Sequence, residues 1–150
     1  SIKYLQARLA NANINLTRVD LVGEMPRDQY LQAYSDVDIV LDTFPFPGGT
    51  TTAEALWMGV PTLTLAGTTL LGRQGESMLG CLGMTDWVAY STTEYVESAL
   101  KKASDLEGLA ALRATLREAA LPSPLFDAAA FARNLTSAFC EMAHKHCNSR

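Results

Sequence analysis

The chain has 150 residues, 48% of them hydrophobic, which is enough for one hydrophobic core and too few for two independent domains. Twelve basic residues against sixteen acidic ones give a formal net charge of −4, so no broad electropositive surface is available for a nucleic-acid backbone or an anionic membrane. We therefore expect a single domain whose partners include neither nucleic acid nor membrane.

Hydrophobic periodicity predicts helices and strands in alternation. In chain order the expected elements are a helix over residues 4–14, a strand at 19–22, a helix around 30–34, a strand at 38–42, a helix over 51–58, a strand at 61–66, a helix over 75–82, a strand at 87–90, helices over 93–103 and 106–120, and a final helix after residue 127 with its apolar stripe at 131, 135, 139 and 142. The strands are rich in Leu and β-branched residues and show little alternation, which is typical of a parallel sheet covered by helices on both faces. The predicted fold class is α/β, with a doubly wound parallel sheet.

The stretch LDTFPFPGGTTTAEALWMG, residues 41–59, runs from a strand through a Pro/Gly turn into a Thr-rich helix start. Gly48 and Gly49 allow a phosphate to approach the backbone, because neither residue carries a Cβ. The first turn of the helix adds unpaired N–H groups, threonine hydroxyls and the positive end of the helix dipole. Glu54 lies one turn after Thr51 on the same helix face and can accept hydrogen bonds from ribose hydroxyls. The motif therefore suits a nucleotide diphosphate.

The same residues also fit a purely structural interpretation. In a capping box, Thr51 and Glu54 would satisfy each other's backbone donors at the start of the helix. Capping boxes are common, and these residues alone leave both interpretations open.

The longer stretch LDTFPFPGGTTTAEALWMGVPTLTLAG resembles the O-GlcNAc transferase / SPINDLY family of glycosyltransferases, especially its bacterial tetratricopeptide-linked members. Further matching motifs follow in the same order, namely LLGRQGESML, CLGMTDWVAYS, EYVESALKKASDL and LPSPLFDAAAFARNL. The resemblance covers almost the whole chain. It implies a two-domain glycosyltransferase-B fold, in which residues 1–150 form the C-terminal part of the nucleotide-sugar-binding domain, a partial Rossmann-like domain. The chain lacks an initiator Met and opens on a helical pattern, so we expect a segment of a longer protein.

The resemblance also implies roles for single residues around the donor diphosphate. In the family a Thr pair at the helix start contacts the diphosphate, and this pair matches Thr50 and Thr51. The acidic residue one turn later binds ribose and matches Glu54. Animal members carry a His directly before the Thr pair, where this chain has Gly49, so any phosphate contact from that His is absent and backbone amides are expected to contribute more.

The segment GEMPRDQYLQAY resembles the part of the family that surrounds the nucleotide base. The resemblance implies that Met25 presents backbone groups to uracil, that Arg27 replaces a Lys, and that Tyr30 replaces a His that stacks on the base. An aromatic ring at Tyr30 preserves stacking. Two structural alternatives remain open, because Tyr30 also fits a core-facing helix position and Arg27 also fits a solvated turn.

For the parent protein the resemblance implies an enzyme that transfers N-acetylglucosamine from UDP-N-acetylglucosamine to a Ser or Thr hydroxyl of an acceptor protein. No cofactor or metal is required, because the helix start, Thr50, Thr51 and a Lys located before Ser1 would stabilise the departing diphosphate. This chain holds no catalytic residue of its own and is not expected to catalyse alone. Two alternatives stay open: a donor such as UDP-glucose or GDP-fucose, and a non-enzymatic α/β module for assembly or regulation.

A Rossmann-like sheet with strand order 3-2-1-4-5-6 places the strand at 19–22 third and the strand at 38–42 fourth. The two strands between them are missing from this chain. Because an unpaired sheet edge seeks a partner, we expect non-native pairing or a dimer at that edge.

Two clusters of metal-ligating residue types have ordinary structural interpretations. Asp36 and Asp38 spell the DxD pattern of metal-dependent glycosyltransferases, yet they lie at the start of a strand, opposite the carboxyl-end crevice, where capping or solvation is expected. Cys140, His144 and Cys147 share one helix face, but their spacing matches no common zinc pattern. We therefore expect no metal site.

The sequence also predicts the location or contacts of four further side chains. We expect Trp57 and Trp87 in the core and Asp127 as the cap of the last helix. Arg73 has two interpretations, since it can either reach the phosphates or brace the loop after the third strand, and bracing is favoured.

The three cysteines are odd in number and too sparse for a disulfide-built secreted domain, which indicates a reducing compartment. No run approaches the roughly 20 apolar residues of a membrane-spanning helix, and the first residues lack the charged start and apolar run of a signal peptide. We expect a cytoplasmic location.

Overall fold

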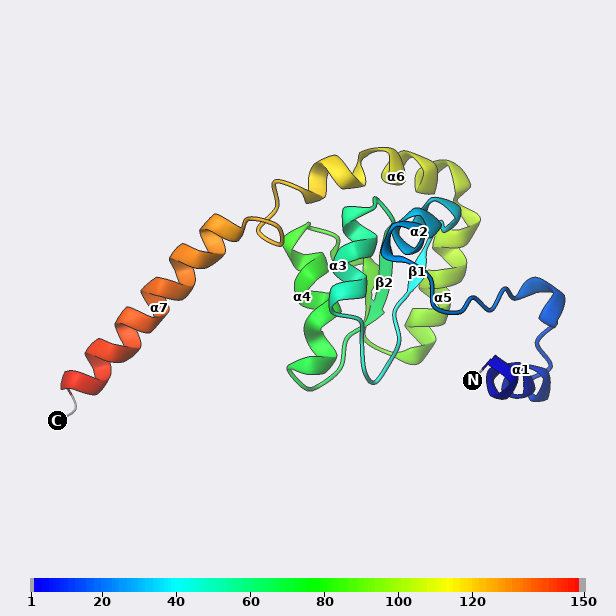
Figure 1. Cartoon of the computed structure of the whole chain (residues 1–150), viewed down its shortest axis with the longest axis horizontal. Helices are drawn as coiled ribbons and strands as arrows, with labels where there is room; N and C mark the ends of the chain where they lie inside the picture. Colours follow the sequence, from blue (N-terminus) through cyan, green and yellow to red (C-terminus); the bar gives the residue numbers. More distant parts are fainter. Residues whose placement is uncertain (1, 149–150) are drawn as a thin grey trace. The chain divides into compact units, whose positions relative to one another are not determined.

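The computed structural model describes residues 2–148, and the chain divides into two compact units, one ending at Gln32 and one beginning at Ala33 (Figure 1). The first unit contains helix α1 (Ile2–Asn11), a short 3-10 helix (Leu16–Arg18) and helix α2 (Arg27–Gln32), none of which has a buried residue. The side chain of Asn15 caps the 3-10 helix by accepting the Thr17 N–H at 3.0 Å. The helices of this unit are thus held by local bonds.

The strand predicted at residues 19–22 is wrong, because the structure has extended chain without ladder bonds there. Val22 is 69% exposed, whereas a strand in a doubly wound sheet would bury it. The physical reason is the lack of a neighbour: a strand forms only when another strand pairs with it, and the predicted sheet order gives this segment no partner within the chain.

The second unit holds a parallel sheet of three strands in the order β1-β2-β3. The strands are short, with β1 at Val40–Leu41, β2 at Thr62–Leu65 and β3 at Val88–Ala89. Pairing is in register between Val40 and Thr62 and between Thr64 and Val88. The predicted α/β class with a parallel sheet is confirmed, and three of the four predicted strands are present.

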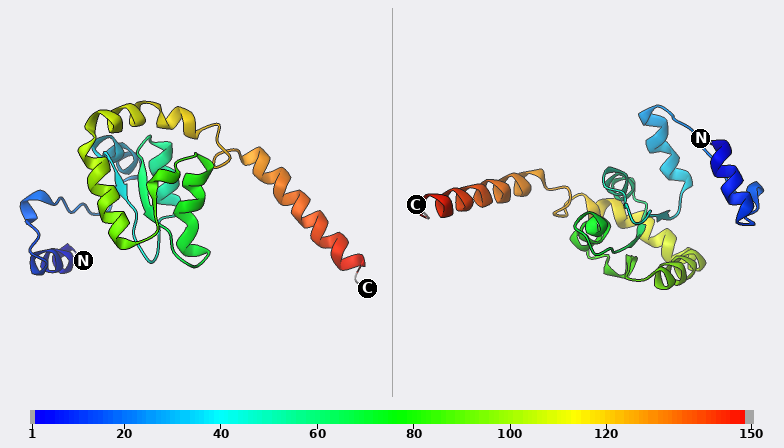
Figure 2. Two further views of the ribbon diagram at one scale, coloured as in Figure 1. Left: turned by 180° about the vertical axis from the view of Figure 1, so that it is seen from behind. Right: turned by 90° about the horizontal axis from the view of Figure 1, so that it is seen from below.

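Helices cover both faces of this sheet. Figure 2 shows α3 (Thr50–Trp57) and α4 (Gln74–Cys81) on one side of the strands and α5 (Thr92–Ser104) on the other. Short 3-10 helices at Ala33–Asp36, Leu71–Arg73 and Thr85–Trp87 precede β1, α4 and β3. Helix α6 (Leu106–Ala120) follows α5, with the boundaries that the sequence predicted.

The hydrophobic core lies between the sheet and these helices. Its buried members include Leu56, Leu63, Leu79, Val88, Tyr95, Leu109 and Leu116. Trp87 is 5% exposed, as predicted for a core residue. The core prediction for Trp57 is wrong, because this ring is 41% exposed and packs edge-on against Phe126 at a centroid distance of 5.2 Å.

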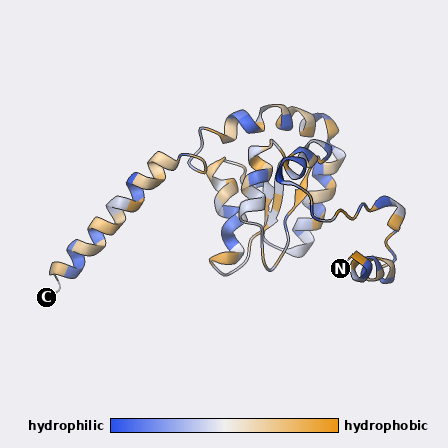
Figure 3. Cartoon of the chain, in the orientation of Figure 1, coloured by the Kyte–Doolittle hydropathy of each residue, from blue (hydrophilic) through white to orange (hydrophobic). Residues whose placement is uncertain are grey.

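The last helix, α7 (Ala128–Asn148), begins where the sequence predicted a cap, because the Asp127 carboxylate accepts the Ala130 N–H at 2.8 Å. Its apolar stripe remains exposed, with Phe131 at 65% and Phe139 at 58%, and hydrophobic and hydrophilic residues alternate along the helix (Figure 3). Among residues 2–148, none of the helices combines the length and apolar character that a membrane crossing requires.

Tyr95 ties helix α5 to the end of β1. Its side chain is buried, its hydroxyl donates to the backbone carbonyl of Asp42 at 2.8 Å, and its ring lies edge-on to Phe44. Burial disfavours the phenolate and raises the pKa of Tyr95 to about 12, and the charge of Asp42 adds to this shift.

This arrangement predicts how stability changes with pH. The neutral phenol stabilises the fold fully below about pH 10, the ordinary pKa of an unfolded Tyr, and this contribution is lost as pH rises towards the folded pKa of about 12. Tyr95→Phe should lower the free energy of unfolding at neutral pH by about 0.5–1.5 kcal/mol and remove part of the alkaline loss. Urea unfolding over this pH range measures both effects. Tyr4→Phe, at a 66% exposed position, is the control, and equal alkaline slopes in the three proteins would contradict the prediction.

Candidate functional site

The candidate site lies at the carboxyl end of β1, in the turn formed by residues 42–49, which we call the β1–α3 turn. Two short hydrogen bonds shape it. The Thr43 hydroxyl donates to the Phe46 carbonyl at 2.7 Å, and the Gly48 N–H donates to Asp42 Oδ1 at 2.7 Å. The turn therefore folds back on the end of its own strand and delivers the chain into helix α3.

Helix α3 begins one residue earlier than predicted. Its first residue is Thr50, and its N-cap is Gly49, which has no side chain to cap the helix. A capping box would require Thr51 at the N-cap position, so the capping box that the sequence allowed is not formed. The first backbone bond runs instead from Ala53 N–H to the Gly49 carbonyl at 3.1 Å.

This helix start leaves backbone donors available. Within the described chain, no acceptor lies in hydrogen-bond reach of the N–H groups of Gly49, Thr50 or Thr51. Thr50 and Thr51 are exposed, so their hydroxyls and amides are accessible from solvent. Donors of this kind, at the positive end of a helix, suit an anion.

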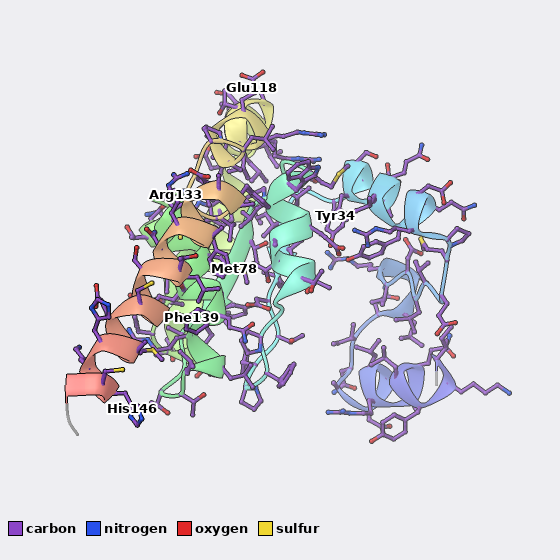
Figure 4. All side chains as sticks on the ribbon, turned by 60° about the vertical axis from the view of Figure 1, so that its left-hand side comes forward. Tyr34, Met78, Glu118, Arg133, Phe139 and His146 are labelled. Atoms are coloured by element: carbon purple, nitrogen blue, oxygen red, sulfur yellow. The ribbon has the colours of Figure 1, made fainter. Side chains whose placement is uncertain are left out.

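Neighbouring side chains hold the first turn of α3 in place. The Thr52 hydroxyl is buried and donates to the Gly48 carbonyl at 3.0 Å. On the other side, the Tyr34 hydroxyl donates to the Thr51 carbonyl at 3.3 Å, and Figure 4 shows Tyr34 beside α3. Glu54 is partly buried in the same helix, three residues after Thr51. The structure thus brings Gly48, Gly49, Thr50, Thr51 and Glu54 together at one helix start.

The two glycines of the turn differ in the space around them. A Cβ on Gly48 would collide with the Thr51 hydroxyl and would lie 2.7 Å from the Thr52 hydroxyl. A Cβ on Gly49 would meet only the side-chain oxygen of Gln74, at 3.0 Å. Gly48 is therefore required by packing, whereas the position of Gly49 has room that a flexible neighbour can vacate.

Three predicted site residues belong to the unit that ends at Gln32. Arg27 opens α2 and is exposed, while Met25 and Tyr30 are partly buried. The Tyr30 N–H donates to the Pro26 carbonyl at 2.9 Å, which fixes the first turn of that helix. The predicted contacts of these residues with a nucleotide base stay predictions.

Asp42 is a residue of the site that sequence reasoning missed. It follows β1 directly and is 6% exposed, although it carries a carboxylate. A signal was present, because a carboxylate that directly follows an apolar strand lies at the carboxyl edge of the sheet, where ligands of doubly wound folds bind.

Arg73 braces the start of α4. Its guanidinium pairs with Glu76 through contacts of 2.7 and 3.1 Å, and the Tyr90 hydroxyl donates to the same carboxylate at 3.2 Å. The hydrogen bond with Arg73 lowers the pKa of Glu76, and the same pairing raises the pKa of Arg73. The hydrogen bond to Glu76 raises the pKa of Tyr90. This geometry matches the bracing interpretation of Arg73.

The DxD pattern and the cysteine cluster occupy ordinary positions. Asp38 accepts from the Arg113 guanidinium at 2.7 Å, and Arg113 also donates to the Tyr34 carbonyl at 3.3 Å. Cys140 and Cys147 are exposed on α7. Among the residues that the structure describes, no three His, Cys, Asp or Glu side chains gather in a way that could hold a metal ion.

The fold and this helix start define a class of protein: α/β domains that offer backbone amides to an anion at the carboxyl edge of a parallel sheet. The sequence model of glycosyl transferase family 41 matches residues 3–135, and the chain belongs to this family. The predicted family is thereby confirmed.

Individual relatives agree with this assignment. The chain is 45% identical over 132 residues to a probable UDP-N-acetylglucosamine–peptide N-acetylglucosaminyltransferase SPINDLY of Solanum lycopersicum, covering 87% of this chain and 14% of the relative. It is 33% identical over 166 residues to the corresponding protein SEC of Arabidopsis thaliana, covering 95% of this chain and 17% of the relative. A mutant O-GlcNAc transferase of Thermobaculum terrenum superposes with a TM-score of 0.90 at 35% identity, over 98% of this chain and 28% of that one.

The contrast between the two glycines yields a prediction. Gly48→Ala should lower the free energy of unfolding by about 1–3 kcal/mol, because the new methyl group forces the threonine hydroxyls or the turn to move. Gly49→Ala is the matched control and should cost less, since only the end of Gln74 must shift. Urea unfolding at neutral pH compares the two variants, and equal losses would show that the turn does not have the packing described.

Proposed function

We propose that this chain forms the C-terminal part of the nucleotide-sugar-binding domain of a longer protein O-glycosyltransferase, and that its helix α3 binds the donor diphosphate. The parent enzyme would transfer N-acetylglucosamine from UDP-N-acetylglucosamine to Ser or Thr of an acceptor protein. The observation that carries the proposal is the start of α3 in a member of glycosyl transferase family 41: three amides without an internal acceptor lie beside two glycines and exposed threonines. Membership of the family supports the donor and acceptor classes.

The chemistry of this helix start fits a leaving diphosphate. When the sugar is transferred, negative charge develops on the diphosphate oxygen that leaves. The amides of Gly49, Thr50 and Thr51, together with the hydroxyls of the two threonines, can donate hydrogen bonds to that charge without reorganising. Neither a metal nor another cofactor is part of the proposal.

The remaining donor contacts follow from the predicted roles. Glu54, three residues after Thr51, would accept hydrogen bonds from the ribose hydroxyls. Met25 would offer backbone groups to uracil, Arg27 would lie beside the base, and Tyr30 would stack on it. UDP-N-acetylglucosamine is the proposed donor, with UDP-glucose and GDP-fucose as the alternatives, and the test below separates UDP donors from GDP donors.

Two finer features of the parent are also proposed. We place it in the cytoplasm, because its sparse cysteines fit a reducing compartment. Strand β1 pairs with β2 along one edge, and Leu41 in it is 55% exposed. A further strand, from the rest of the parent or from a second copy of the chain, would pair with the other edge.

Thr51→Val tests the diphosphate contact. Val keeps the β-branched shape of Thr but removes the hydroxyl, so UDP binding should be lost or weakened by about tenfold or more. Since Thr51 is exposed, the free energy of unfolding should change by less than about 1 kcal/mol. Isothermal titration calorimetry with UDP measures the affinity.

Thr115→Val on the exposed surface of α6 is the matched control and should leave UDP binding unchanged. Competition between UDP and GDP then tests the base, and UDP should bind more tightly. If the unaltered chain binds no UDP, the donor-site proposal is wrong and a non-enzymatic α/β module becomes the better interpretation.

A further inference from the structure

Asp42 lies between the starts of two helices. One carboxylate oxygen faces the turn before α3, since a Cβ on Gly48 would lie 3.3 Å from Oδ1. The other oxygen faces α4, since a Cβ on Gly75 would lie 3.0 Å from Oδ2. Glycine at both positions therefore makes room for a carboxylate that is 6% exposed. The packing around this side chain is specific to its shape.

Three hydrogen bonds connect Asp42 to three different parts of the fold. Oδ1 accepts the Gly48 N–H at 2.7 Å, Oδ2 accepts the Thr64 hydroxyl at 2.8 Å, and the backbone carbonyl accepts the Tyr95 hydroxyl at 2.8 Å. Burial of a carboxylate is unfavourable unless hydrogen bonds compensate for the lost water. Donors to a carboxylate form short and strong bonds, so these contacts hold the β1–α3 turn against β2 and α5.

The Gly48 peptide group is fixed at both of its polar atoms. Its N–H points to Asp42 Oδ1, and its carbonyl accepts the Thr52 hydroxyl at 3.0 Å. The next three N–H groups along the chain have no such acceptor within residues 2–148. The Gly48 amide is thus bonded within the fold, whereas the described residues provide no acceptor for the amides from Gly49 to Thr51.

We propose that Asp42 is a positioning residue of the donor site: by drawing the Gly48 amide inward, its carboxylate sets the direction in which the amides of Gly49, Thr50 and Thr51 face the diphosphate. This inference rests on the proposed function. Asp42 itself is not expected to touch the donor diphosphate, because its side chain is buried and a carboxylate offers no hydrogen-bond donor to an anion.

The charge of Asp42 provides a test that separates positioning from stability alone. A negative charge near an anion site weakens anion binding. Asn at this position keeps the shape and an oxygen that can accept the Gly48 N–H, but it lacks the charge. Asp42→Asn should therefore bind UDP as tightly as the unaltered chain, or more tightly. Asp42→Ala removes the acceptor and should weaken UDP binding about tenfold or more.

The Gly48 amide gives a measurement that needs no ligand. Hydrogen exchange, followed by NMR on the full chain, should show a protected Gly48 amide in the unaltered chain and in Asp42→Asn. In Asp42→Ala this amide should exchange about tenfold faster or more, because its acceptor is gone. Thr115→Val, at an exposed position of α6 outside this network, is the control and should leave both the exchange rate of the Gly48 amide and the UDP affinity unchanged.

Each outcome supports or contradicts the positioning role of Asp42 or the proposed donor-binding function. A Gly48 amide that exchanges equally in Asp42→Ala and the unaltered chain overturns the positioning role, whether or not UDP binds. If the unaltered chain binds UDP and Asp42→Ala binds it equally, the positioning role is overturned and the proposed function stands. If Asp42→Ala does not fold, a loss of UDP affinity in a folded Asp42→Asn with a protected Gly48 overturns the inference. If no protein binds UDP, the proposed function fails and the donor role of Asp42 fails with it.

Discussion

Where the β1–α3 turn enters helix α3, one backbone N–H has an internal acceptor and the next three have none among residues 2–148, and this division shapes the site. One amide, that of Gly48, is bonded to a buried carboxylate. The amides that follow have no acceptor within the described residues, because the first turn of any helix lacks intrahelical partners and Gly49 brings no capping side chain. A ligand with negative charge can satisfy such donors, which is the basis of the diphosphate site proposed above.

This arrangement depends on the rest of the second unit. Asp42 is anchored by Thr64 from β2 and by Tyr95 from α5, which follow it by 22 and 53 residues in the chain. The sheet brings them together, because the carboxyl ends of parallel strands lie at one edge. The core between the sheet and the helices thus supports the turn, which does not depend on the exposed Thr50 and Thr51 for its stability.

Much of the fold could be predicted from the sequence, because local patterns specify local elements. Helix α6 starts and ends where its apolar spacing and Pro122 predicted, and the cap at Asp127 formed as expected. The strand predicted at residues 19–22 is absent, because a hydrophobic run forms a strand only when another strand is available to pair with it. The prediction that Trp57 lies in the core was wrong for a related reason. The exposure of this side chain depends on how it packs against Phe126, a residue far away in sequence.

The candidate site was predicted in part. Its glycines and threonines were recognisable from their order, but the helix start was displaced by one residue, because Gly49 and not Thr51 occupies the N-cap. Asp42 was missed: its place after an apolar strand indicated the carboxyl edge of the sheet, but its burial and its hydrogen bonds with Thr64 and Tyr95 depend on distant segments. Long-range hydrogen bonds of this kind are visible only once the chain is folded.

The unequal surroundings of Gly48 and Gly49 have a consequence for how such sites diversify. Crowding permits no side chain at the first position, whereas the second faces a movable Gln74. A side chain can therefore be introduced at the second glycine by a single exchange, without remodelling the scaffold. The architecture in this way sets a crowded position and a tolerant position side by side at one helix start.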